Sequence, residues 1–176
     1  MPLDIAFGIM GAAIAAPLIG IPLTGGLIVL CILFALSPDA DYLIYLARTR
    51  ASNEFAHEHR DLLHNPIIFI GICGAMLSAI SVKIAALFAA LALLHFLHDS
   101  VGVGWGVRWA YPFSKKYFKF FHNGKSITSW TPAEQKEMAR SHGDPQWLAH
   151  YFKSREFYLE LAVFCVAVVI ALLFFF

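Results

Sequence analysis

The stretch IAALFAALALLHFLHDSVG, residues 84–102, is an apolar run that ends in polar side chains. His98 and Asp99 lie three and four residues after His95, so on a helix the three side chains share one face. Imidazoles and carboxylates at the end of a hydrophobic helix are costly unless they are paired or bound to a metal. The stretch therefore predicts a buried helix that carries a polar site at its end.

The whole chain is unusually apolar. Of its 176 residues, 59% are hydrophobic and 14% are charged, and the mean hydropathy is +0.67. Average globular proteins have about 45–50% apolar and about 25% charged residues, so this composition indicates an integral membrane protein. The length favours a single domain, residues 1–176. The net charge of +1 argues against a nucleic-acid partner, since such proteins usually carry a basic excess.

The first apolar segment, residues 5–36, carries no charge. A spanning helix needs about 20 residues, so the segment is too long for one span and short for two. Pro17, Gly20 and Pro22 lie near its middle, where such residues break or kink a helix. We expect a hairpin of two short helices, about 4–20 and 24–36, with one long kinked helix as the alternative.

The second apolar segment, residues 66–98, is interrupted at 81–83 and predicts another hairpin, with helices at about 66–80 and 83–98. Residues 157–176 form a last apolar run that is long enough to span. The expected fold is all-α: a polytopic membrane protein with two short helical hairpins, an interfacial helical region and a C-terminal transmembrane helix.

Two polar regions, residues 37–64 and 99–156, separate these segments. Within the second, Thr131, Pro132 and Glu134 mark a helix start, and Gly143 marks its end. The stretch DPQW, from residue 144, begins another helix that could run straight into the last span. The aromatic and basic stretch 105–121 suits the headgroup zone, as an anchor or as a wall of a substrate entrance.

The two hairpins place both polar regions on the same side of the membrane. That side would hold every acidic residue and every Lys and Arg except Lys83. Basic residues favour the cytoplasm, so we expect the polar regions on the cytoplasmic face.

Three groups of potential metal ligands fall on this side, each next to the end of an apolar helix. They are Asp39 and Asp41 in SPDAD, His57, His59 and His64 in HEHRDLLH, and the group at 95–99. Each alone is explained as a helix cap or an interfacial residue. Together they predict a metal site, because imidazole and carboxylate both bind divalent metals. With His and Asp ligands and no Cys, zinc is the first expectation, and Mn or Fe remain open.

The stretches SPDADYL, HRDLLHNP and HFLHDSVGVGWGVRWAYPFS resemble the signature blocks of the YdjM-like membrane-bound metal-dependent hydrolases. These small inner-membrane proteins carry a P-D-x-D block, an H-R-x-x-x-H block and an H-x-x-x-D block followed by a Gly-rich stretch and Y-P-F. The three blocks span residues 37–114 of this chain, in the same order. The family is thought to be distantly similar to zinc-dependent phospholipase C and single-strand nucleases.

The resemblance implies one or two zinc ions, with metal ligands at Asp39, Asp41, His59, His64, His95 and Asp99. It also implies catalytic roles for Arg60 and Asp99. Arg60 could hold a phosphate oxygen, or it could pair with neighbouring carboxylates or lipid headgroups. His57 and His98 lie outside the blocks and are candidates for contacts behind the ligands. Many family members have a His near the start of the chain, and here no His precedes His57.

The implied activity is hydrolysis of a phosphoester, with a phospholipid as one candidate substrate and the bilayer as the main partner. A non-enzymatic membrane protein with a structural metal or His/Asp cluster is the alternative. An ion or proton carrier is a third possibility, disfavoured because the ionisable groups lie at helix ends.

Overall fold

A computed structural model describes residues 1–49, 63–101, 105–122, 124–144 and 146–175. The described part is mostly helical. Four of its helical segments are long and apolar enough to cross a membrane, namely Pro2–Ile19, Gly25–Arg48, Val82–Val101 and Arg155–Leu173. The chain is therefore an integral membrane protein, and the expected helical fold is confirmed.

The first apolar segment forms the expected hairpin of two helices, α1 (Pro2–Ile19) and α2 (Gly25–Leu36). Gly20 ends α1 with φ of 70°, a left-handed conformation that glycine adopts without steric cost. Thr24 begins α2, and its Oγ1 accepts a hydrogen bond from the Leu27 backbone N–H at 3.1 Å. A turn between these two caps explains why the chain folds back instead of continuing as one kinked helix.

The chain does not leave the helical path after α2. A 3₁₀ turn, η1 (Ser37–Asp39), leads into α3 (Ala40–Thr49), where the sequence had indicated the start of a polar region. Pro38 is tolerated because it lies in the first turn, where its missing N–H costs nothing. The continuous helical path fixes the positions of both aspartates of SPDAD.

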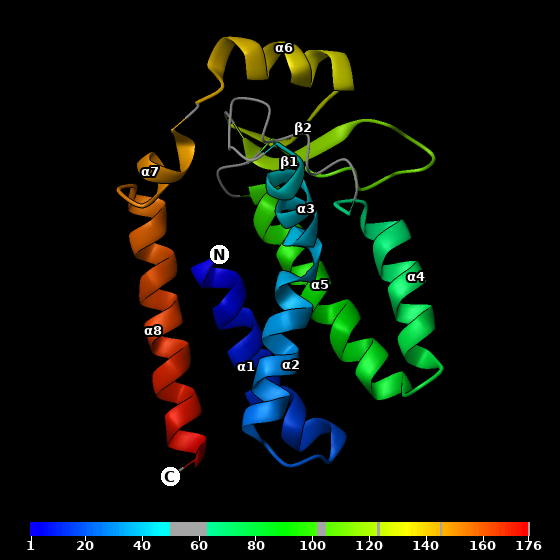
Figure 1. The fold of residues 1–176 in the computed structure, drawn as a ribbon, viewed down its shortest axis with the longest axis vertical. Coiled ribbons are helices and arrows are strands. Elements are labelled where there is room, and N and C mark those ends of the chain that lie inside the picture. The colour runs from blue at the N-terminus through cyan, green and yellow to red at the C-terminus, as the bar shows by residue number, and fades with distance from the viewer. Residues whose placement is uncertain (50–62, 102–104, 123, 145, 176) are drawn as a thin grey trace.

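The second hairpin, α4 (Pro66–Ser78) and α5 (Val82–Val101), agrees with the expectation. Its turn lies at the same end of the molecule as the α1–α2 turn (Figure 1). Lys83, the one basic residue expected on that side, donates from Nζ to the Ile19 carbonyl at 2.8 Å. It thereby satisfies a carbonyl at the end of α1 that has no partner within the helix.

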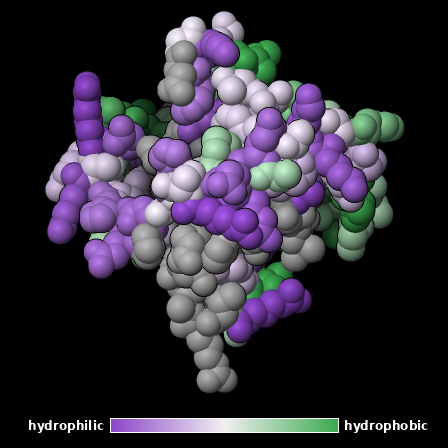
Figure 2. All heavy atoms as spheres, turned by 90° about the horizontal axis from the view of Figure 1, so that it is seen from above, coloured by the Kyte–Doolittle hydropathy of each residue, from purple (hydrophilic) through white to green (hydrophobic). Residues whose placement is uncertain are grey.

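The polar parts of the chain gather at the opposite end (Figures 1 and 2). They include an antiparallel hairpin of β1 (Tyr117–His122) and β2 (Lys125–Trp130), in which Tyr117 pairs with Trp130. The sequence interpretation did not include this hairpin. The following helix, α6 (Pro132–His142), was expected. Thr131 caps it by accepting at Oγ1 from the Glu134 backbone N–H at 3.3 Å, and the Thr131 N–H donates to Glu134 Oε2 at 2.7 Å.

The last part of the chain differs from the expectation of one uninterrupted helix. A short helix, α7 (Trp147–Tyr151), is followed by a break, and α8 (Arg155–Phe175) begins after it. Ser154 supplies the new start, because its Oγ accepts a hydrogen bond from the Phe157 N–H at 3.1 Å. The break lets α7 lie over the polar end while α8 crosses the apolar layer.

The spanning helices pack through small residues. Ala12, Ala16 and Ala35 are buried between α1, α2 and α5, and Ala6 and Ala167 are buried between α1 and α8. Small side chains let membrane helices approach closely, where dispersion contacts replace the hydrophobic effect as the source of attraction. The helices α1 and α2 approach closely at Gly8, where an added Cβ would lie 2.5 Å from the Ile32 Cα.

We predict that Gly8→Ala destabilises the protein, because the new methyl group would force α1 and α2 apart. Overpacking of this kind typically costs about 1–3 kcal/mol. Gly71→Ala on α4 is the matched control, since nothing lies within 4 Å of its added Cβ. Thermal unfolding in detergent should give a lower midpoint for Gly8→Ala than for Gly71→Ala, and equal midpoints would contradict the close packing.

Candidate metal centre

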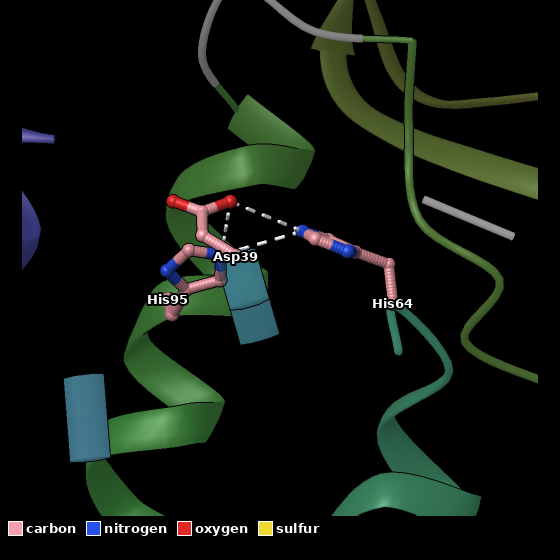
Figure 3. A group of neighbouring side chains, drawn as sticks. All are labelled: Asp39, His64 and His95. Atoms are coloured by element: carbon pink, nitrogen blue, oxygen red, sulfur yellow. Dashed lines mark hydrogen bonds and ion pairs between the residues drawn. The ribbon is translucent and has the colours of Figure 1, made fainter. Parts of the chain in front are cut away.

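Three segments that are distant in sequence bring their polar side chains together at the polar end. Asp39 comes from η1, His64 from the residues just before α4, and His95 from α5 (Figure 3). One ligand atom of each lies within 4.8 Å of those of the other two. Asp99, one helical turn after His95, adds a second carboxylate to this group.

The atoms that face one another are two imidazole nitrogens and two carboxylate oxygens. His64 Nε2 lies 3.4 Å from His95 Nε2, and both nitrogens lie 3.6 Å from Asp39 Oδ1. Asp99 Oδ2 lies 3.1 Å from His64 Nε2 and 3.9 Å from His95 Nε2. All four are potential electron-pair donors to one central cation.

These separations fit the ligand set of a tetrahedral metal site. Ligand atoms in such a zinc site lie roughly 3.3–3.5 Å apart, because each is about 2.0–2.2 Å from the ion. The five separations given above run from 3.1 to 3.9 Å. Asp39, His64 and His95 form the compact group, and Asp99 contacts both histidines without belonging to it. Three converging ligands with a further carboxylate beside them fit a divalent metal.

Each histidine is held from behind by another carboxylate. His64 Nδ1 lies 3.0 Å from Asp41 Oδ2, and His95 Nδ1 lies 3.2 Å from Asp4 Oδ1. When each ring is neutral with its proton on Nδ1, that proton faces the carboxylate, which can only accept, and the Nε2 lone pair faces the group. This is the usual arrangement of metal-binding histidines, in which an outer carboxylate fixes the ring and raises its basicity.

The carboxylates around His64 favour a positive charge at the site. Burial alone would lower the pKa of the His64 imidazole, but contacts with the carboxylates of Asp39, Asp41 and Asp99 raise it to about 10. The group thus attracts a positive charge strongly, and a proton on His64 meets that need when no metal is bound. A divalent cation would neutralise Asp39 and Asp99 together.

The surroundings of the histidines are apolar. His64 and His95 are each 1% exposed, and the ring of Phe96 packs edge-on against both of them at 5.9 Å. The carboxylates are more open, with side-chain exposures of 22% for Asp39 and 12% for Asp99. The carboxylates are therefore the more solvent-accessible part of the group.

Asp41 and His98 occupy positions different from those of the four converging residues. Asp41, expected among the ligands, contacts the far nitrogen of His64 and also accepts from the Leu63 N–H at 3.0 Å. His98 faces Asp4 at 3.1 Å and Glu160 at 3.4 Å, away from the group. The predictions for His57, His59 and Arg60 fall outside the described residues.

The sequence interpretation missed Asp4 and Glu160, which complete the polar contacts behind His95 and His98. Asp4 is 1% exposed, and its Oδ1 approaches both histidines. A signal for both was present, since each carboxylate lies at the start of a strongly apolar helix. Ionisable groups in spanning helices are costly, so each should have been assigned a partner.

Comparison with known proteins agrees with the membrane character of the chain. No curated protein and no solved structure gives a significant match to the chain. The family model described as YdjM inner membrane protein matches residues 4–176, and the chain therefore belongs to the YdjM inner membrane protein family.

Proposed function

We propose that this protein is a membrane-bound metal-dependent hydrolase that acts on a phosphoester at the membrane interface, with zinc as the metal. One observation carries the proposal: two histidine Nε2 atoms and two carboxylates converge, and each histidine Nδ1 is held by a further carboxylate. An arrangement that fixes both the ring orientation and the tautomer is what a metal ligand requires.

Asp39, His64, His95 and Asp99 would hold the metal. When bound, zinc lowers the pKa of a coordinated water and polarises a phosphoryl oxygen, the chemistry that phosphoester hydrolysis needs. Asp99 is partly exposed beside His64 and can also accept a proton from an attacking water, as the catalytic role proposed for it requires. Arg60 is proposed to bind a phosphate oxygen.

The location of the site supports a lipid phosphoester as substrate. The site lies where the apolar helices end, at the polar end of the molecule (Figure 1). On the nearby stretch after α5, Phe113 and Phe121 are 86% and 76% exposed, and Lys115, Lys116 and Lys125 are exposed as well. Aromatic and basic side chains of this kind suit the headgroup layer, which we place on the cytoplasmic face.

The first prediction from this proposed function is that the purified protein contains a divalent metal, with zinc the most abundant. His95→Ala should abolish this binding, because it removes one of two buried imidazole ligands. His142→Ala, which alters an exposed histidine on α6, is the control. Elemental analysis measures the metal content of the three proteins, which are purified without chelators and with added zinc. Wild-type protein that contains no metal under these conditions would refute the proposal.

The second prediction concerns the carboxylate behind His64. Asp41→Asn should weaken zinc affinity about 10–100-fold, because the amide no longer supports the basicity of the imidazole. Asp144→Asn is a matched control, since Asp144 contacts His150 Nδ1 in an exposed pair remote in sequence from the site. Competition with a chromophoric chelator measures both affinities, and equal values would contradict the role assigned to Asp41.

The third prediction is metal-dependent turnover. Vesicles of phosphatidylglycerol, and bis(4-nitrophenyl) phosphate as a soluble probe, should be hydrolysed by the zinc-loaded protein and not after chelation. Asp99→Asn should lower kcat about 100-fold or more, which is the effect of losing a proton acceptor. A metal-loaded protein with no turnover across a panel of phosphoesters would favour the alternative, a structural metal that ties helix ends together.

A further inference from the structure

Glu160 is an acidic residue in the first turns of α8, which is the least buried of the four described candidate spans. Only 11% of the apolar window of α8 is buried inside the protein, yet the Glu160 side chain is only 12% exposed. An ionised side chain in such a helix is stabilised only by specific partners. The partners of the Glu160 side chain therefore indicate its role.

Glu160 has partners on both of its oxygens. His98 Nε2 lies 3.4 Å from Glu160 Oε1, and the Tyr151 hydroxyl donates to Glu160 Oε2 at 2.6 Å. The Met1 amino group lies 3.5 Å from the same Oε2 atom. Glu160 thus joins α8 to α7 and to the C-terminal end of α5.

His98 continues the contacts from Glu160 toward the metal centre. Its Nδ1 lies 3.1 Å from Asp4 Oδ1, and the same oxygen lies 3.2 Å from Nδ1 of His95. Both ring nitrogens of His98 face carboxylate oxygens, so the ring is fixed at two points. The line of contacts runs from Glu160 through His98 and Asp4 to the back of a proposed metal ligand.

Apolar packing holds α1 against α8, the helices that carry Asp4 and Glu160. Ala6 and Ala167 are fully buried where α1 meets α8, and Ala171 is 8% exposed in the same contact. These small side chains bring α1 and α8 into close contact, so a shift of Glu160 on α8 would change its position relative to Asp4 on α1. A displacement of α8 would therefore change the orientation of the His95 ring.

We propose that Glu160 is a positioning residue for the metal centre: acting through His98 and Asp4, it orients His95 so that Nε2 faces Asp39 and His64. This inference rests on the metal binding of the proposed function and adds a role for α8. Metal binding and the docking of α8 are then coupled, and each favours the other by the same factor.

The test compares Glu160→Gln with Glu156→Gln in the full-length protein in nanodiscs. Glu156 is exposed on the same helix, so the control makes the same change one turn earlier. Zinc affinity is measured by competition with a chromophoric chelator, and the geometry at the ligands by the visible absorption of the Co²⁺-substituted protein. We expect Glu160→Gln to weaken zinc binding about 10-fold and to change the Co²⁺ spectrum, which is the effect of losing an outer partner.

Two further variants separate positioning from general destabilisation. Asp4→Asn combined with Glu160→Gln should bind zinc no more weakly than Asp4→Asn alone, because Glu160 acts through Asp4. Tyr151→Phe removes only the hydroxyl that holds Glu160, and it should shift the Co²⁺ spectrum in the same direction by a smaller amount. This mild change keeps the inference testable if Glu160→Gln does not fold.

The outcomes distinguish this inference from the proposed function. If the wild-type protein binds zinc and the Glu160→Gln affinity stays within two-fold of Glu156→Gln with an unchanged Co²⁺ spectrum, the role of Glu160 is refuted and the metal centre stands. If the wild-type protein binds no metal, both are refuted. Additive losses in the double variant would also overturn the positioning role.

Discussion

The structure depends on the convergence of electron-pair donors at the ends of apolar helices. The two imidazole nitrogens lie 3.4 Å apart, and each lies 3.1–3.9 Å from an oxygen of Asp39 and of Asp99. Such atoms repel one another unless a cation lies among them, and water at the site is limited because both histidines are buried. The fold can bring these side chains together only because the group is completed by a proton or by a metal.

The apolar part of the protein makes this convergence possible. Small residues let α1, α2, α5 and α8 approach closely, and the glycine at position 8 leaves no room for a side chain against Ile32. Rigid contact between these helices fixes where each of their polar ends lies. The position of the site thus follows from packing in the membrane layer, which itself contains few polar atoms.

Much of the fold could be predicted from the sequence because membrane helices are dictated by local composition. Uncharged runs, Pro and Gly at 17–26, and the Thr131 capping residues predicted both hairpins and α6. Three features could not be predicted. They are the continuation through η1 into α3, the β1–β2 pairing, which needs contacts between two strands, and the break before α8, where Ser154 caps the new helix.

For the site, the sequence by itself determined which ligand types are present and that His95 and Asp99 share a helix face, because a turn of helix sets that spacing. Only the tertiary structure decided which nitrogen of each histidine faces the group, and which carboxylates lie behind. Asp4 and His98 are 94 residues apart and meet because α1 packs beside α5. Contacts between distant segments depend on how whole helices pack against one another. A local sequence pattern does not contain that information.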